Sequence, residues 1–405
     1  MKRIIIIFVA LGLLSCAQKS EITTGEKSGT FSGIIEHGNF SDKILIEIEQ
    51  DSTHVNVYFS SLEQNANRIP FQGIEVNGDS ISFNLQSDFY LYQFRNRWID
   101  NNSKLQGVLH VDTITVPYIL EKEALSSNAN PRREDVSFES NGLKINGTIW
   151  HPENNENKAL VILTSSSGAD RSASRSEAIL FAQKGFTTFH YDKRGTGSSD
   201  GDWETASIEE LSQDDINAIN YFSDKTGISH QKIGILGSSQ GAAKIPLILN
   251  ELEDIQYGIL VSCPGVSLLE SDLNYWKNRN EELLGNEVAD AVKLERKVFE
   301  FIGGRLTRSD LEASINEKKT KPWFEHIWIP NLEEVRTDKK LLYSPIPHLE
   351  STKQPILIIQ GQMDEIIPAN SYALISDALK KSGNNKFKTV FKVARMVEII
   401  QPIHQ

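Results

Sequence analysis

The sequence predicts an α/β protein with a doubly wound, mostly parallel sheet, preceded by a small all-β domain. Two observations carry this prediction. In the C-terminal two thirds of the chain, short and wholly apolar runs alternate with longer amphipathic stretches, which is typical of strands buried between helices. In the N-terminal third, apolar and polar residues alternate with period two, which is typical of antiparallel strands with one buried face.

Composition supports a folded protein and excludes several functional classes. The 405 residues are enough for two or three domains, and the 39% of hydrophobic residues are enough for a sizeable core. The 42 Lys and Arg against 54 Asp and Glu give a net charge of −12, which speaks against a nucleic-acid partner. Two cysteines, Cys16 and Cys263, are too few for a disulfide framework, and Cys263 is expected to be a buried small residue. No spacing typical of metal ligands or of a phosphate-binding loop occurs, so we expect no metal and no cofactor.

Residues 1–16 are predicted to be a lipoprotein signal peptide. Two basic residues precede the apolar run 4–14, which is too short to span a membrane and fits a secretory signal. The run ends in Leu13-Leu14-Ser15-Cys16, which resembles the bacterial signal that is cut before a lipid-carrying cysteine. We therefore expect a lipidated Cys16, a tether over residues 17–28, and anchoring in the bacterial cell envelope on the periplasmic or outer-membrane face. An ordinary signal peptide with a chance cysteine is the alternative.

Residues 29–125 are predicted to form the all-β domain, a small barrel or sandwich of seven or eight antiparallel strands. Asn77-Gly78-Asp79 is a strong hairpin turn. The aromatic residues of this domain are expected to fill its core, and the alternative is that they line a ligand cavity. The alternating segments are 44–48, 54–59, 81–85 and 113–116, and the aromatic residues are Phe89, Tyr90, Tyr92, Phe94 and Trp98.

A polar, proline-containing linker is expected at 126–133, and the α/β domain at 134–405. A long helical insertion at about 264–351, with helices at 273–302 and 309–318, is expected to cap the sheet. The expected parallel strands are 159–164, 187–191, 233–236, 257–261 and 356–359, and the expected helices between them are 176–184, 208–222 and 242–252.

The segment Gly237-Ser238-Ser239-Gln240-Gly241 directly follows a predicted strand and opens a predicted helix. A serine on so sharp a turn has a strained backbone, and glycines two residues before and after it avoid clashes. The turn lifts the hydroxyl clear of the sheet, and the helix N-terminus favours negative charge beside it. The five-residue pattern alone is weak evidence, so its strand–turn–helix context carries the prediction that Ser239 is a nucleophile.

Together with three further segments, this turn makes the chain similar to the α/β-hydrolase superfamily. The similarity is to bacterial secreted esterases that carry an extra N-terminal β domain, and it covers about residues 136–393. Residues 164–171 are similar to the family's His-Gly-Ser-Gly-Pro-x-Asp-Arg loop, with its first His and Gly replaced. Residues 191–199 look like its Asp-x-Arg-Gly-x-Gly-x-Ser turn, and residues 361–368 look like its acid loop.

The resemblance implies a Ser–His–acid mechanism. A serine hydroxyl needs a base to take its proton, and a carboxylate orients the imidazole that does so. Asp364 is the expected acid because it follows a buried strand. The oxyanion donors are expected to be the backbone N–H groups of Gln240 and Ser166. Asp192 and Arg194 are expected to brace their turn by ion pairing rather than take part in the chemistry.

The expected catalytic histidine is missing from its usual place. The resemblance puts it, followed by a glycine, just after the last strand at 386–393, but none of residues 394–398 is His. Met396-Val397 must be encoded ATG GTN, which can contain a His-Gly pair when read one base earlier, so we expect a frameshift near residue 392 or 393. The alternative is a native short tail that brings His404 to the site as the base.

These observations predict an exported, lipid-anchored serine hydrolase that cleaves carboxylic esters through an acyl-enzyme intermediate. A small-molecule acyl ester is the expected partner, and nothing in the sequence indicates an oligomeric state. A thioesterase or a serine peptidase of the same fold is the alternative within this class. A non-catalytic envelope binding protein built on a hydrolase scaffold is the alternative from another class, and the missing histidine favours it.

Overall fold

The computed structural model describes residues 27–38, 40–50, 54–61, 66–86, 90–123, 131–154, 157–163, 170–362 and 364–392. Cys16, Ser166 and His404 lie outside these residues. The described chain divides into two compact units, one formed by residues up to 59 and 70–124, the other by 60–69 and 125 onward. No helix within the described ranges is long and apolar enough to cross a membrane.

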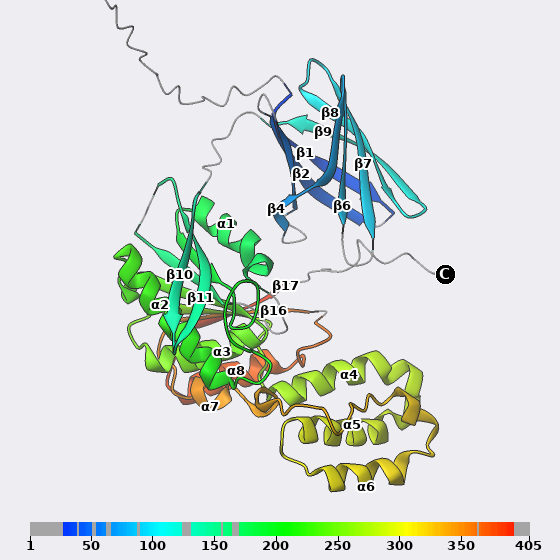
Figure 1. Cartoon of the computed structure of the whole chain (residues 1–405), viewed down its shortest axis with the longest axis vertical. Coiled ribbons are helices and arrows are strands. Elements are labelled where there is room, and N and C mark those ends of the chain that lie inside the picture. The colour runs from blue at the N-terminus through cyan, green and yellow to red at the C-terminus, as the bar shows by residue number, and fades with distance from the viewer. Residues whose placement is uncertain are drawn as a thin grey trace, which may run out of the picture. The chain divides into compact units, whose positions relative to one another are not determined.

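Nine strands between residues 29 and 122 form an antiparallel sheet, which confirms the predicted all-β domain (Figure 1). The edge strands β4 and β5 follow each other along the chain with only Phe71 between them, so the sheet is nearly a barrel. The sequence predicts seven or eight strands, fewer than the nine observed. β5 is hard to predict because it is mostly exposed and lacks the alternating pattern. The strands, in sheet order, are β4 (Ala66–Pro70), β3 (Val55–Ser61), β2 (Phe40–Gln50), β1 (Gly29–His37), β9 (Ile114–Lys122), β8 (Lys104–Val111), β7 (Leu91–Ile99), β6 (Ser80–Gln86) and β5 (Gln72–Asn77).

Aromatic side chains fill the core of this unit, as expected. Tyr92, Phe94 and Trp98 point to the same face of β7 and are all buried. The ring of Phe94 stacks on that of Phe83 at 5.6 Å and meets that of Phe71 edge-on at 5.1 Å. Phe89 lies outside the described residues.

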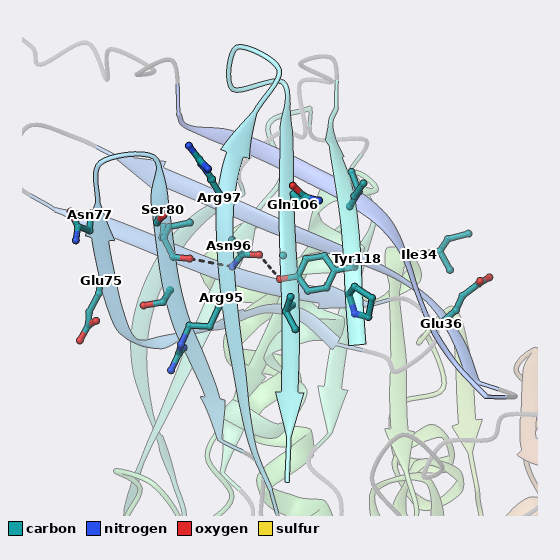
Figure 2. A pocket seen from close by; sticks show the side chains of 16 residues that line it. Ile34, Glu36, Glu75, Asn77, Ser80, Arg95, Asn96, Arg97, Gln106 and Tyr118 are labelled. Atoms are coloured by element: carbon teal, nitrogen blue, oxygen red, sulfur yellow. Dashed lines mark hydrogen bonds between the residues drawn. The ribbon is translucent and has the colours of Figure 1, made fainter. Parts of the chain in front are cut away.

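An open groove of about 1020 Å³ runs across β5–β9 and β1 (Figure 2). Beneath it, the buried Tyr118 hydroxyl donates a hydrogen bond to Asn96 Oδ1, and Asn96 Nδ2 donates to the Ile81 carbonyl at 3.4 Å. A Cβ at Gly107 would come within 2.2 Å of Asn96 Oδ1, so this close packing requires glycine. The groove is lined by exposed polar side chains such as Arg95, Arg97 and Gln106 and by apolar ones such as Val108 and Ile119.

The second unit is built on an eight-stranded mixed sheet whose central strands are parallel, which confirms the predicted α/β fold. The antiparallel hairpin β10–β11 starts the sheet, and its turn at Asn141-Gly142 has φ values of 52° and 80°. The strands, in sheet order, are β10 (Arg132–Ser140), β11 (Leu143–His151), β13 (Thr187–Tyr191), β12 (Ala159–Leu163), β14 (Ile233–Ser238), β15 (Tyr257–Val261), β16 (Ile356–Gly361) and β17 (Phe387–Lys392).

Helices cover both faces of this sheet (Figure 1). Val161 of β12 belongs to the apolar cluster beneath α2, α3 and α8, whereas the adjacent Leu160 and Ile162 pack against α1. Helix α2 begins with a capping box between Ser207 and Glu210. These helices are α1 (Arg175–Gln183), α2 (Ile208–Thr226), α3 (Gln240–Glu251) and α8 (Ser371–Lys381), with short 3-10 turns η1 (Arg171–Ser174) and η2 (His230–Lys232).

The predicted insertion lies between β15 and β16 and is helical (Figure 1). The predicted helix 273–302 is two helices, because Gly285 leaves the helical conformation with φ 50° and ψ −125°. Trp323 is buried in the core that these helices share. We call residues 264–351 the cap. Its elements are α4 (Leu268–Leu284), η3 (Gly285–Glu287), α5 (Val288–Ile302), α6 (Arg308–Lys318), η4 (Pro322–His326), η5 (Lys339–Leu342) and α7 (Ile346–Leu349).

Candidate active site

Ser239 lies on the sharp turn that the sequence predicts, between the end of β14 and the start of α3. Its backbone has φ 52° and ψ −121°, a conformation that costs a non-glycine residue about 1–3 kcal/mol. Two hydrogen bonds hold it there: its N–H donates to the Val261 carbonyl at 3.0 Å, and its carbonyl accepts from the Ala243 N–H at 3.0 Å. A strained serine that is held this firmly is typical of a nucleophile elbow.

The tight turn explains the glycine two residues before the serine. A Cβ at Gly237 would lie 2.6 Å from the Gly241 carbonyl carbon and 2.8 Å from the Ala242 nitrogen. These are backbone atoms of the first turn of α3, so they cannot rotate away as a side chain would. Gly237 therefore lets the helix start directly above the end of the strand.

The Gln240 N–H, which the sequence suggests as an oxyanion donor, lies at the start of α3. As the first residue of α3 it has no carbonyl four residues earlier in the helix to bond, and no backbone carbonyl in the described ranges accepts from it. Ser239 does not cap the helix with its side chain either. The positive end of the α3 dipole lies at Ser239, which directly precedes the helix. Ser166, the second expected donor, lies outside the described residues.

Asp364 follows β16 and is half-buried. Its Oδ1 accepts from the N–H groups of Ile366 and Ile367, each at 3.0 Å. Gln360 fixes the loop from the side of the sheet, because its amide donates to the Pro368 carbonyl at 3.3 Å and accepts from the Tyr372 N–H at 3.2 Å. We call residues 364–368 the acid loop. Within the described residues, the two hydrogen bonds of the Asp364 carboxylate involve Oδ1, and none involves Oδ2.

The sheet register brings Ser239 and Asp364 to the same edge. Ser238 of β14 pairs with Val261 of β15, which pairs with Ile359 of β16, so these three residues are level. Neighbouring strands lie about 4.8 Å apart, so the ends of β14 and β16 are about 10 Å apart. One imidazole between a serine and a carboxylate spans a gap of this size. The strand β17 lies beside β16 and ends at Lys392, level with Gly361, so the chain leaves it at this same edge.

None of the histidines in the described ranges hydrogen-bonds to Ser239. His190 lies on β13, separated from β14 by β12, and its ring contacts Trp150 Nε1 and Ser174 Oγ at 3.1 Å each. Burial lowers the pKa of His190 to about 3, so it is a neutral structural residue. The His348 carbonyl accepts from Asn250, which is about 16 Å along α3 from Ser239. His404, the candidate base, lies outside the described residues.

Ion pairs brace the turn 191–199, as expected for Asp192 and Arg194. Asp192 pairs with Arg171 and accepts from the backbone N–H groups of Arg171 and Ser198, each at 3.0 Å. Arg194 forms a two-pronged pair with Asp214 of α2 at 2.6 and 2.9 Å. Both carboxylates are buried. The charges of both carboxylates are therefore paired with arginines inside the fold.

Sequence reasoning missed a buried charge pair behind the nucleophile turn. Lys244 of α3 is 1% exposed and forms an ion pair with Asp215 of α2 at 2.7 Å. The Tyr191 hydroxyl donates to the same carboxylate. This network attaches α3 to α2 and β13. Cys263 is also buried, as expected, and burial raises the pKa of its thiol, which disfavours the thiolate form.

The cap contributes two residues that the sequence does not single out. Asn274 Nδ2 donates to the carbonyls of Glu365 and Ile366 at 3.2 and 3.1 Å, and Asn278 Nδ2 donates to the Glu365 carbonyl at 2.7 Å. Helix α4 therefore contacts the acid loop directly after Asp364. In the described part of the chain, no group of three His, Cys, Asp or Glu residues has the arrangement of a metal site.

Comparison with known proteins gives matches to hydrolases. A family described as X-Pro dipeptidyl-peptidase (S15 family) matches residues 141–392, more than half of the chain. An uncharacterised 31.7 kDa protein from the traX-finO intergenic region of Escherichia coli is 26% identical over 205 residues, 49% of this chain and 70% of that protein.

Solved structures give matches at lower identity. The esterase Pf2001 of Pyrococcus furiosus has a TM-score of 0.44 and 16% identity, covering 67% of this chain and 85% of its own. A proline iminopeptidase of Mycobacterium smegmatis has a TM-score of 0.43 and 17% identity, covering 64% and 89%. With the α/β fold, the elbow and the acid loop in place, the family match identifies the chain as an α/β-hydrolase that belongs to the S15 family of X-Pro dipeptidyl-peptidases.

Proposed function

We propose that this hydrolase cleaves carboxylic esters through an acyl-enzyme formed on Ser239. The observation that carries the proposal is the strained Ser239 backbone beside a Gln240 N–H that no backbone carbonyl in the described ranges accepts. The strained turn places Ser239 at the sheet edge, and the Gln240 N–H supplies a donor where negative charge would develop.

In the proposed reaction, Ser239 Oγ attacks the acyl carbon while a base takes its proton. The Gln240 N–H, with the Ser166 N–H as proposed second donor, stabilises the oxyanion of the tetrahedral intermediate. The bond to the leaving alcohol breaks as the base returns the proton to the alcohol oxygen, and water then releases the acid by the same route. Asp364 is proposed to orient the base, which is either His404 or, in the alternative reading frame, a histidine just after β17.

A second candidate is cleavage of X-Pro peptides, which the family match favours. The two candidates share Ser239 and differ in the leaving group, an alcohol or an amine. The amine needs full protonation to leave, so peptide cleavage depends more strongly on a well-placed base than cleavage of an activated ester does. For a chain with no histidine directly after its last strand, the ester is the easier substrate.

Turnover of p-nitrophenyl acetate and of an X-Pro p-nitroanilide by the chain and by Ser239→Ala tests this proposal. We expect weak ester hydrolysis that falls to background in Ser239→Ala, because no acyl-enzyme can form without the Ser239 hydroxyl. The melting temperature should stay the same or rise, since the substitution removes no packed group. Equal turnover by both proteins would refute the proposal, and faster anilide than ester cleavage would favour the peptidase.

We also propose that Cys16 becomes the lipid-carrying N-terminus and anchors the enzyme in the cell envelope. The eleven-residue apolar run 4–14 followed by Leu-Leu-Ser-Cys supports this. Metabolic labelling with a fatty acid should mark the wild type and not Cys16→Ser. Equal labelling of the two proteins would count against the anchor.

A further inference from the structure

The two cap asparagines contact the acid loop at the peptide groups that hold Asp364. The Glu365 carbonyl accepts from Asn274 and Asn278, and the N–H of the same peptide group, that of Ile366, donates to Asp364 Oδ1 at 3.0 Å. The next peptide group repeats the arrangement: the Ile366 carbonyl accepts from Asn274, and the Ile367 N–H donates to Asp364 Oδ1. Each peptide group therefore connects a cap amide to the carboxylate.

A peptide group is planar, so fixing its carbonyl also fixes the direction of its N–H. A hydrogen bond accepted by the carbonyl also polarises the group and strengthens the hydrogen bond that its N–H donates. The asparagine amides therefore act on the Asp364 carboxylate in two ways, by orienting its donors and by strengthening them. Water at the same carbonyls would polarise them but would not fix their direction.

Helix α4 is itself attached to the helix that carries the nucleophile turn. The Leu268 N–H, at the start of α4, donates to the Tyr343 carbonyl at 3.0 Å, and the Tyr343 hydroxyl donates to the Ala243 carbonyl of α3 at 3.1 Å. Leu269 and Leu273 are buried and hold the same end of the helix. These contacts fix the position of α4 relative to α3. The hydrogen bonds from the two asparagines in turn fix the acid loop relative to α4.

We propose that Asn274 and Asn278 are positioning residues that set the direction of the Asp364 carboxylate relative to Ser239, so that the cap takes part in assembling the catalytic residues. This inference rests on the proposed function of Asp364. Asn274 is the stronger of the two because it holds both carbonyls, whereas Asn278 holds only that of Glu365.

Alanine variants of the two asparagines test the proposal, with Asn280→Ala as the matched control. Asn280 lies on the same helix, but its amide donates to the Trp276 carbonyl within α4 and does not contact the acid loop. We expect kcat on p-nitrophenyl acetate to fall about tenfold in Asn274→Ala/Asn278→Ala, less in Asn274→Ala, least in Asn278→Ala, and not in Asn280→Ala. KM should change less than twofold, because none of these residues is proposed to touch substrate.

The pH profile separates positioning from general loosening of the cap. A carboxylate beside an imidazolium favours the charged form and raises the pKa of the base. A carboxylate that points away loses this effect, so the acid limb of kcat/KM should move to lower pH in the double variant when both chains also carry Met396→His/Val397→Gly, which places a histidine after β17. An unmoved limb with a large fall in melting temperature would mean that the asparagines only stabilise the cap, and would overturn the proposal.

Amide hydrogen exchange gives a readout that does not depend on activity. In the double variant, exchange at Ile366 and Ile367 should rise about tenfold, while exchange at Ser239 and Ala243 stays unchanged. Exchange and kcat that match Asn280→Ala would overturn the proposal. Faster exchange at the acid loop, together with full turnover by Ser239→Ala, would instead show that the asparagines position Asp364 and that the proposed catalytic function is wrong.

Discussion

The nucleophile turn and the acid loop lie two strands apart at one edge of the sheet, but they are held in different ways. Ser239 is fixed by its own neighbours, because Gly237 allows the tight approach of α3 and the Ala243 N–H closes the turn. Asp364 is fixed partly by its own loop and partly by α4, which precedes it by almost ninety residues along the chain. The position of the nucleophile therefore depends on local backbone geometry, whereas the position of the acid depends on contacts with the cap.

Among changes to the nucleophile turn, Gly237→Ala is expected to be the most damaging. Its Cβ would meet backbone atoms at 2.6–2.8 Å, and such overpacking costs about 1–3 kcal/mol of folding free energy. Because the atoms displaced belong to the nucleophile turn, we expect ester turnover to fall by about a hundredfold or more, together with a lower melting temperature.

Gly227→Ala is the matched control for that experiment. Gly227 ends α2 at φ 70° with open space around it, so alanine there meets backbone strain but no clash. It should lower the melting temperature and leave turnover unchanged. Equal losses of turnover in the two variants would mean that the tight turn at Gly237 has no special role.

The base can be tested from the side of the acid loop. The chain leaves β17 level with Gly361, so a histidine shortly after Lys392 starts at the edge where Asp364 lies. We expect Met396→His/Val397→Gly to raise kcat/KM on p-nitrophenyl acetate at least about tenfold, since a missing general base typically costs a factor of 10²–10⁴.

Met396→Asn/Val397→Gly, which changes the same positions without adding an imidazole, is the control and should give no gain. If the histidine variant gains nothing either, and His404→Ala alone silences the original chain, then His404 is the base.

Ionisation of a buried glutamate in the cap offers a further test, with a smaller expected effect. Glu295 of α5 is 1% exposed, and Oε2 has no hydrogen-bond partner within the described residues. Burial raises the pKa of Glu295 to about 7, although a hydrogen bond from the Trp328 backbone opposes the shift. Because the folded value lies above the unfolded value of 4.5, stability is lost as pH rises from about 4.5 through 7.

We therefore expect the melting temperature to fall between pH 5 and pH 8 by several degrees more in the wild type than in Glu295→Gln. Glu282→Gln, on the exposed surface of α4, should behave as the wild type. Exchange at Ile366 should rise with pH more than exchange at Ala243 if the cap supports the acid loop. Parallel curves for wild type and Glu295→Gln would show that Glu295 does not titrate in this range.

Features held by local contacts could be predicted from the sequence, whereas features held by distant contacts could not. The parallel strands and Ser239 could be predicted because their signals are contiguous: apolar runs, two glycines and a serine at the start of a helix. The hairpin β10–β11 also carries a local signal, Asn141-Gly142, which was available and was missed. Asn274 and Asn278 could not be found, because two asparagines one turn apart on a helix usually face water, and their partners lie 87–92 residues away.

The most direct test of the central claim is labelling with a fluorophosphonate, which reacts covalently only with an activated serine. Treated protein is digested, and the modified residue is identified by mass spectrometry, with Ser239→Ala and heat-denatured protein as controls. We expect one adduct, on Ser239, which is absent from both controls. No adduct on the native chain, or an adduct on another residue that persists in Ser239→Ala, would contradict it, and the absence of any adduct would favour a non-catalytic binding protein on this scaffold.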